Sequence, residues 1–200
     1  MKEVSQNSRW IKVWYESGHT LTDGAIFEVR HRDQPFGEFH WGDFKNYEIK
    51  TEKFWGKGPL PDNVLDLIGT QKSLFCWVRN NWPLPGGPYS RTAGWLACDD
   101  GTMEIADFIH LDVGGKEPVL TQIHVKGSHS DSATRSISVS QYEVVIGQAV
   151  KNLCFLDRLN MYDGLSEGLK NQIGKLVWHD GLVSTREEML DTIAQIGTSY

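Results

Sequence analysis

Two short hydrophobic segments of the chain carry side chains that could take part in chemistry. The first, EIADFIHLD (104–112), contains Asp107, and the second, TQIHVKGS (121–128), contains His124 and Lys126. Both segments alternate in the manner of β-strands, in which every second residue faces the same side. The alternation puts Asp107 on the isoleucine-bearing face of its strand and puts His124 and Lys126 together on one face of the next. An acid, a histidine and a lysine are therefore expected on neighbouring strands against a hydrophobic core.

The carboxylate of Asp107 needs a partner if helices cover that face of the strand. A buried charge is costly unless a cation, a metal ion or hydrogen bonds compensate it. Lys126 on the adjacent strand is one available cation, so a purely structural Asp–Lys pair is one interpretation. A metal site is the other, and the residues alone leave both open.

The segments that must position these side chains fall into two parts. Up to about residue 55, apolar and polar residues alternate between turns rich in glycine and proline, which predicts an antiparallel β-meander. We therefore expect a meander subdomain over 1–55 and a core domain over 56–200. Because the chain stops just after an amphipathic helix, we expect it to be a fragment of a larger protein. The expected strands of the meander are 10–17, 24–31, 37–44 and 46–53.

The core domain is predicted to begin with a helix over 63–82, where apolar residues recur at helical spacing. Three strands separated by acidic and glycine-rich turns follow, at 92–98, 103–111 and 118–127. Helical patterns then cover 138–159, 165–178 and 184–197. This order predicts an α+β fold in which a helix, three antiparallel strands and a further helix follow the meander.

Within this order of elements, three short motifs resemble the PD-(D/E)XK nuclease superfamily. They are MEIADFI (103–109) in the second strand of the core, IHVKGS (123–128) in the third strand, and GQAVKN (147–152) in the helix that follows. The pattern is similar to that of the nuclease-like domains at the C-terminal end of superfamily II helicases. The resemblance implies a restriction-endonuclease-like core that hydrolyses phosphodiester bonds of DNA, or alternatively RNA, with Mg²⁺ or Mn²⁺. It also implies a helicase–nuclease or defence assembly, with a helicase or targeting module in the same chain or complex as partner.

The resemblance assigns roles to five residues. Asp107 would bind the metal ion, Lys126 would orient or polarise the attacking water, and Gln148 would help to frame the site. Asp66 in the first helix is the candidate for a further metal-binding acid. His124 stands where the superfamily usually has Asp or Glu, and since imidazole suits Mn²⁺ better than Mg²⁺, His124 as a ligand would alter the metal preference or compromise catalysis. A catalytically inactive nuclease-like domain that binds nucleic acid or regulates a partner is the alternative.

The composition of the chain narrows the choice of partners. With 26 acidic and 20 basic residues and a formal net charge of −6, the chain lacks the excess of Lys and Arg with which proteins coat nucleic acid, so contacts with DNA must be local. Cys76, Cys98 and Cys154 are widely spaced and odd in number, which favours reduced thiols in the cytoplasm. No segment approaches the ~20 apolar residues of a membrane span, so no membrane partner is expected. The tryptophan-containing meander leaves a third function open, that of an interaction module.

Overall fold

The computed structural model of the chain consists of two compact units, Met1–Trp41 and Gly42–Tyr200. It describes residues 12–14, 19–22, 25–28, 42–56, 58–82, 93–101, 104–136, 138–156 and 158–196. The sequence predicted the boundary near residue 55. The boundary lies earlier because Tyr47, Phe54 and Trp55 pack against the hydrophobic core of the second unit.

The first unit contains a three-stranded antiparallel sheet, as its alternating sequence predicts. The strands are β1 (Lys12–Trp14), β2 (His19–Thr22) and β3 (Ala25–Glu28), in the order β1-β2-β3. The expected strand at 37–44 lies largely outside the described residues. The expected strand at 46–53 is a series of turns closed by backbone hydrogen bonds. The described sheet of this unit is therefore shorter than the predicted meander.

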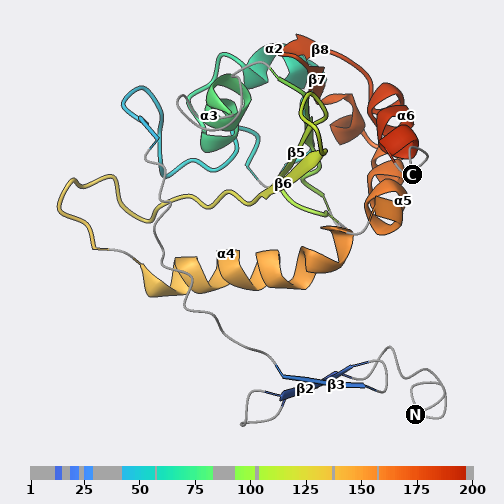
Figure 1. Cartoon of the computed structure of the whole chain (residues 1–200). Coiled ribbons are helices and arrows are strands. Elements are labelled where there is room, and N and C mark those ends of the chain that lie inside the picture. The colour runs from blue at the N-terminus through green and yellow to red at the C-terminus, as the bar shows by residue number, and fades with distance from the viewer. Residues whose placement is uncertain are drawn as a thin grey trace. The chain divides into compact units, whose positions relative to one another are not determined.

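A five-stranded antiparallel sheet forms the centre of the second unit (Figure 1). Its strands are β4 (Trp95–Cys98), β5 (Phe108–Asp112), β6 (Val119–Ile123), β7 (Val177–His179) and β8 (Leu182–Val183). They lie in the order β6-β5-β4-β7-β8. The first three are the neighbouring strands that the alternating pattern predicts, so the fold is α+β with the expected helix, three antiparallel strands and helix in sequence.

The last two strands differ from the prediction of a helix over 165–178. This stretch contains the end of α5 (Arg158–Glu167), two short 3-10 helices, η3 (Gly168–Lys170) and η4 (Gln172–Lys175), and then β7. Val177 and Trp178 are buried because β7 pairs with β4, on the side of β4 that β5 leaves free. That pairing joins residues far apart in sequence, so local periodicity does not encode it.

Helices cover both faces of the sheet (Figure 1). On one face lie α2 (Val64–Ile68) and α3 (Leu74–Asn81), and on the other lie α5 and α6 (Arg186–Ile196). The predicted helix over 63–82 is interrupted because Ser73 caps α3, its Oγ accepting a hydrogen bond from the backbone N of Cys76 at 3.3 Å. The core is thus a sheet between two layers of helices.

One helix, α4 (Val139–Lys151), follows the third predicted strand and continues into the 3-10 helix η2 (Asn152–Leu156). Gln148 and Asn152 lie on its less exposed side, whereas Val139 and Val150 on the opposite side are 69% and 61% exposed. Within the described part of the chain, no helix combines the length and the apolar character needed to cross a bilayer.

Candidate functional site

Three carboxylates meet where the chain passes from β4 to β5. The strand predicted over 103–111 begins only at Phe108, and residues 104–107 form a bend. In a strand Glu104 and Asp107 would face opposite sides, but the bend lets both approach Asp100, just after β4. One carboxylate oxygen from each of the three lies within 4.8 Å of the others. This arrangement suits a divalent cation with oxygen ligands.

These carboxylates line a cavity of about 570 Å³, which we call the acidic hollow. Asp107, Lys126 and Gln148, three of the residues that the sequence singles out, all line it. Glu52 and Lys53 approach from the segment before α2. The tertiary structure thus brings the predicted residues together and adds acids that the motifs do not contain.

The carboxylate of Asp107 is buried, with 8% of its side chain exposed. Its Oδ2 accepts a hydrogen bond from the backbone N of Val125 at 2.7 Å. Burial raises the pKa of Asp107 from 3.8 to about 7, although the Val125 hydrogen bond acts in the opposite direction. The neighbouring carboxylates of Glu104, Asp100 and Glu52 add to the rise. A bound cation would offset this cost of ionising Asp107 at neutral pH.

Local contacts hold the other two carboxylates. Nζ of Lys53 lies 2.6 Å from Oδ2 of Asp100. Burial by itself would lower the pKa of Lys53, but the hydrogen bond and charge of Asp100 raise it overall. The backbone N of Gly101 donates a hydrogen bond to Oε2 of Glu104 at 3.1 Å, and burial raises the pKa of this glutamate. Lys53 therefore offsets part of the negative charge, while Glu104 is oriented by the chain beside it.

A buried ion pair anchors the chain on both sides of Asp100 and Glu104. Nη1 of Arg186 in α6 lies 2.6 Å from Oδ1 of Asp99, and Oδ2 of Asp99 accepts a hydrogen bond from the backbone N of Ile105 at 3.0 Å. Nη2 of Arg186 donates to the carbonyl of Cys98 at 2.6 Å. Through these contacts α6 connects the end of β4 with the bend before β5, and so helps to position Asp100 and Glu104.

Lys126 lines the acidic hollow but pairs with an acid that the sequence analysis does not single out. Among the described residues, its ion pair is with Glu52, whose Oε2 lies 2.9 Å from the lysine Nζ. The same oxygen accepts a hydrogen bond from the backbone N of Gly127 at 3.3 Å. Glu52 falls in a predicted strand of the meander, where alternation carries no chemical signal. It reaches Lys126 because residues 42–55 belong to the second unit and pack against its core.

His124 lies beside Asp107 but is not among the described residues that line the acidic hollow. Its Nδ1 is 4.0 Å from Oδ2 of Asp107, and 5% of its side chain is exposed. Neither ring nitrogen has a hydrogen-bond partner among the described residues. Burial lowers the pKa of this histidine below its usual 6.5, so the imidazole is uncharged at neutral pH. His124 is therefore a neutral neighbour of one member of the cluster, Asp107, and lies outside the described lining of the hollow.

Gln148 approaches the hollow from the less exposed side of α4. The end of this helix is fixed by Asn152, whose Nδ2 donates to the carbonyl of Glu104 at 3.3 Å and whose own carbonyl accepts from Nε2 of Gln122 at 3.1 Å. Asp66, the predicted additional acid, is exposed on α2 and does not belong to the described lining of the hollow. The further acids come from the bend and from the end of β4 instead.

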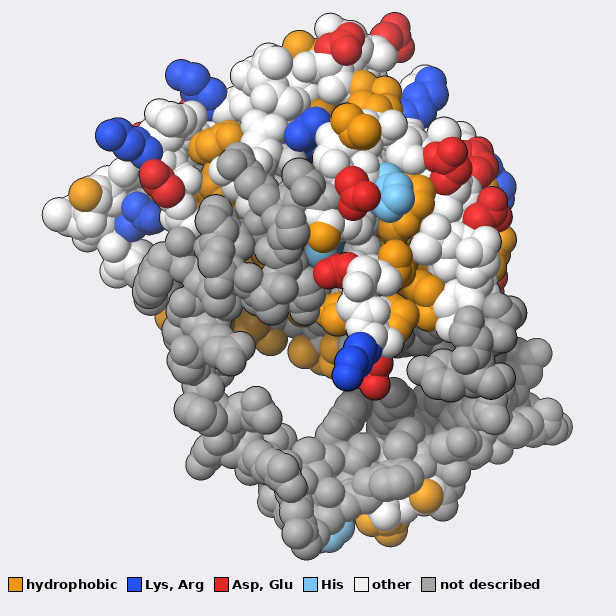
Figure 2. Space-filling model, turned by 45° about the horizontal axis from the view of Figure 1, so that its top comes forward, with side chains coloured by type: hydrophobic (Ala, Val, Ile, Leu, Met, Phe, Trp, Pro, Cys, Tyr) orange, Lys and Arg blue, Asp and Glu red, His pale blue; other side chains and the backbone are white. Residues whose placement is uncertain are grey.

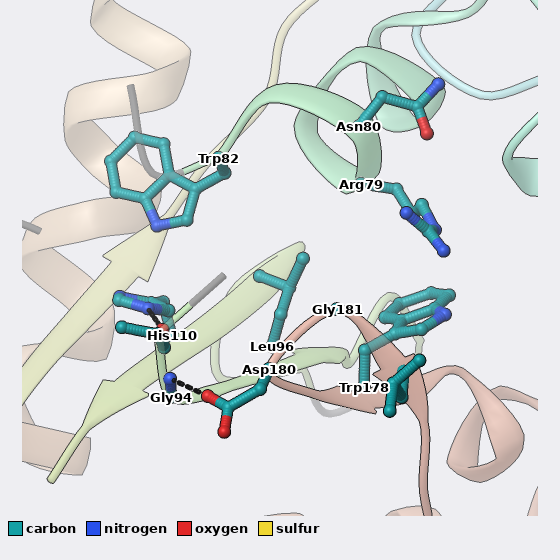
Figure 3. Close-up of a pocket in the computed structure, with 11 residues that line it drawn as sticks. Arg79, Asn80, Trp82, Gly94, Leu96, His110, Trp178, Asp180 and Gly181 are labelled. Carbon is teal, nitrogen blue, oxygen red and sulfur yellow. Dashed lines mark hydrogen bonds between the residues drawn. The ribbon is translucent and has the colours of Figure 1, made fainter. Parts of the chain in front are cut away.

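A second cavity, of about 310 Å³, lies between the end of α3 and strands β4, β5 and β7 (Figure 3). Trp82 faces His110, with ring centroids 6.2 Å apart, and Cζ of Arg79 lies 5.4 Å from the ring centroid of Trp178. Nε2 of His110 is 3.0 Å from the carbonyl oxygen of Ala93. The described lining residues of this aromatic cavity and of the acidic hollow do not overlap. His110 therefore belongs to a separate region, although it lies three residues after Asp107.

Comparisons with known proteins provide no relative for this chain. No family model, no curated protein and no solved structure matches it. The assignment of a function therefore depends on the chemistry of the acidic hollow.

Proposed function

We propose that the second unit is a metal-dependent nuclease domain with a restriction-endonuclease-like core, which hydrolyses phosphodiester bonds of DNA or alternatively of RNA. One observation carries the proposal. In the acidic hollow three carboxylates lie within 4.8 Å of one another, and Lys126 and Gln148 line the same cavity. Three of the five residues to which the resemblance assigns roles thus line one cavity, although they come from a bend, the segment after a strand and a helix.

The clustered carboxylates fit a hard divalent cation. Asp100, Glu104 and Asp107 would hold it through carboxylate oxygens, which Mg²⁺ and Mn²⁺ both accept. The raised pKa of Asp107 supports this fit, because a carboxylate that is costly to ionise in the free protein is stabilised beside a cation. When bound, the metal ion would lower the pKa of a water molecule and offset charge on phosphate oxygens.

The other polar groups of the hollow have roles that follow from their positions. Lys126 can donate hydrogen bonds to a non-bridging phosphate oxygen and stabilise the charge that develops there. In the free protein Glu52 holds that ammonium group at 2.9 Å, so a phosphate must displace Glu52 or share the lysine with it. Gln148 offers an amide that can orient a water molecule or a phosphate without adding charge.

The surface charge supports dependence on a partner for most of the nucleic-acid affinity. The formal net charge is −6, and Figure 2 shows basic and acidic side chains interspersed on the face that it presents. Non-specific affinity grows with the number of phosphates that basic side chains neutralise. We therefore include a helicase or targeting module, in the same chain or complex, in the proposal. The free thiols of Cys76 and Cys98 suit a reducing compartment, and the proposal therefore includes a cytoplasmic location.

A nuclease-like domain that binds nucleic acid without cleaving it is the second candidate function. Two observations favour it. The position two residues before Lys126 carries a buried, neutral histidine, His124, in place of the acid usual in the superfamily. Glu52 also engages the ammonium group of Lys126. Under this alternative the acidic hollow would bind a cation and a phosphate, but hydrolysis would not follow.

The test is cleavage of labelled DNA and RNA by the full chain in Mg²⁺ and in Mn²⁺. Asp107→Asn keeps an acceptor for the Val125 amide but removes the charge. We expect it to slow cleavage by about 100-fold or more, since losing a group that only supports a metal ligand already costs about 10- to 100-fold. Asp191→Asn, on the exposed side of α6, is the matched control and should cleave at the wild-type rate. The cleavage rate of Asp66→Asn shows whether the predicted acid of α2 contributes to catalysis as the acids of the hollow are expected to do.

Calorimetric titration with Mn²⁺ separates metal binding from activity. If the acidic hollow is the metal site, Asp107→Asn should bind Mn²⁺ more weakly than the wild-type chain. Equal Mn²⁺ affinities would contradict the assignment of the site. Metal-dependent DNA binding without cleavage in either metal would identify the second candidate function.

A further inference from the structure

A hollow next to the acidic one differs from it in charge. It is a cavity of about 350 Å³ between residues 126–136 and the N-terminal half of α4, and we call it the basic hollow. Figure 1 shows the chain leaving β6, running out beside α4 and turning back into the start of that helix. Lys126 lines both hollows, so the two cavities adjoin at this residue.

Basic and hydroxyl side chains line the basic hollow. Lys126 and Arg135 contribute positive charges, His129 contributes an imidazole, and four serines contribute hydroxyl groups. None of its described lining residues is an acid. Asp131, in the same segment, lines a different cavity together with Arg135. Lys126 is paired with Glu52 at 2.9 Å, so Arg135 is the cation of the described lining on which the attraction of an anion chiefly depends in this chain of formal net charge −6.

The basic hollow is formed in the free chain. The backbone N of Ser128 donates to the carbonyl of Ile49 at 2.8 Å, and the backbone N of Gly127 donates to Oε2 of Glu52 at 3.3 Å. These bonds fix the start of the segment on the residues before α2. The opposite wall is α4, whose N-cap residue Ser138 makes no side-chain capping hydrogen bond, so its hydroxyl does not occupy the first-turn amides. An anion bound by the basic side chains would therefore also lie near the start of the helix.

Two features favour a phosphate of nucleic acid over a free anion. Because Lys126 is common to both hollows, a strand whose reactive phosphate lies in the acidic hollow would bring a neighbouring phosphate toward the basic one. Contacts to such flanking phosphates are the usual means of positioning a strand. Tyr142, on the wall of the basic hollow, is 50% exposed and offers a ring on which a base can stack.

We propose that the basic hollow is a phosphate subsite for a polynucleotide strand, with Arg135 as its main cation and Tyr142 as a stacking surface for a flanking base. The inference rests on the proposed function and extends it to the class of substrate. The preferred substrate is a polynucleotide with a phosphate beside the reactive one. Mononucleotides and small phosphodiesters would leave the basic hollow unfilled and bind more weakly.

Arg135→Gln tests the subsite through binding alone. Anisotropy of a fluorescent oligonucleotide with the full chain is measured in EDTA, where hydrolysis does not interfere, at several salt concentrations. We expect about tenfold weaker binding at low salt, and a slope of log K against log salt that is less negative by about 0.7–0.9, the share of one phosphate contact. Lys116→Gln, in the exposed turn between β5 and β6, removes the same charge and should retain the wild-type slope. Equal slopes for the two variants would overturn the proposal.

Tyr142→Ala and inorganic phosphate distinguish a nucleic-acid phosphate from a free one. Stacking is not a counterion effect, so Tyr142→Ala should weaken oligonucleotide binding about fivefold or more and leave the salt slope unchanged. Thermal stabilisation of the wild-type chain by inorganic phosphate, with oligonucleotide binding unaffected by Tyr142→Ala and Arg135→Gln, would identify a free-phosphate site and overturn the polynucleotide assignment.

Failure of this inference and failure of the proposed function give different results. If the chain cleaves DNA but Arg135→Gln leaves the salt slope unchanged, the phosphate subsite is wrong and the nuclease assignment stands. If the chain cleaves neither DNA nor RNA but Arg135→Gln alone changes the slope, the nuclease assignment is wrong and the subsite stands.

Discussion

The buried carboxylate of Asp107 predicts an unusual dependence of stability on pH. Its pKa is about 7 in the folded protein and 3.8 in a free aspartate, chiefly because burial disfavours the charged form. The folded state therefore binds this proton more tightly than the unfolded chain does. It follows that the contribution of Asp107 to the free energy of unfolding falls as the pH rises from about 4 to about 7, and stays low above pH 7.

The size of the effect follows from the two pKa values. A difference of about three units corresponds to roughly 4 kcal/mol when the group is fully ionised in both states, as an upper bound. Between pH 5 and pH 8 the loss from this one group is roughly 2–3 kcal/mol. Asp107→Asn resembles the protonated acid at every pH and can still accept the hydrogen bond from the backbone N of Val125. In the metal-free protein the variant should be more stable than the wild type. The difference between their free energies of unfolding should grow by roughly 2–3 kcal/mol from pH 5 to pH 8.

Urea-induced unfolding in EDTA at pH 5, 6, 7 and 8 measures that margin. Other groups titrate in the same range, so the quantity of interest is the difference between variant and wild type at each pH. Asp191→Asn, an exposed change of the same type, should show a difference that is independent of pH. At pH 8, Mn²⁺ should stabilise the wild type more than Asp107→Asn, because a ligand of the folded state stabilises by mass action. A margin for Asp107→Asn that does not grow with pH would refute the reasoning.

Two further predictions concern the support of the site and the sheet. Arg186→Met should destabilise the protein by about 3 kcal/mol in urea unfolding, because it leaves the carboxylate of Asp99 buried without its cation. A loss of stability no larger than that caused by replacing an exposed arginine would contradict the importance of this ion pair. Gly94→Ala should lower the free energy of unfolding by about 2 kcal/mol or more, since Gly94 has φ +84° and an added Cβ would collide with the carbonyl oxygen of Leu111. Gly147→Ala should instead raise it by about 0.5–1 kcal/mol, because Gly147 lies inside α4 with open space around it. If both glycine substitutions changed the stability in the same direction, the local backbone geometry would not explain their effects.

Much of the fold near the candidate site was predictable because the partners are close in sequence. β4, β5 and β6 pair in chain order, so alternation and turn residues were sufficient to place them in one antiparallel sheet. The helical spacing of 138–159 likewise predicted α4. The strand β7 was not predicted, because its partner β4 lies far back in the chain and a short apolar stretch fits a helix or a strand equally well.

The candidate site was predictable in part. Strand alternation singled out Asp107 and Lys126, and the resemblance implied Gln148; all three line the acidic hollow. Alternation would place Glu104 on the face opposite Asp107, because it assumes an extended chain, and the bend at 104–107 breaks that assumption. Glu52 carried no signal, since its role depends on the packing of a segment that precedes the core helices.

Local periodicity in the amino-acid sequence was sufficient to predict the elements that form from neighbouring residues. It also showed which polar side chains lie among hydrophobic ones, because both signals extend over only a few residues. The long-range packing brings Glu52, Asp100 and Glu104 to the same hollow as Asp107 and pairs Lys126 with Glu52. It also leaves His124 beside Asp107 but outside the described lining of that hollow. Those outcomes depend on bends and long-range contacts. A shift of the chain by one residue at such a place would turn a side chain from the hollow toward the core.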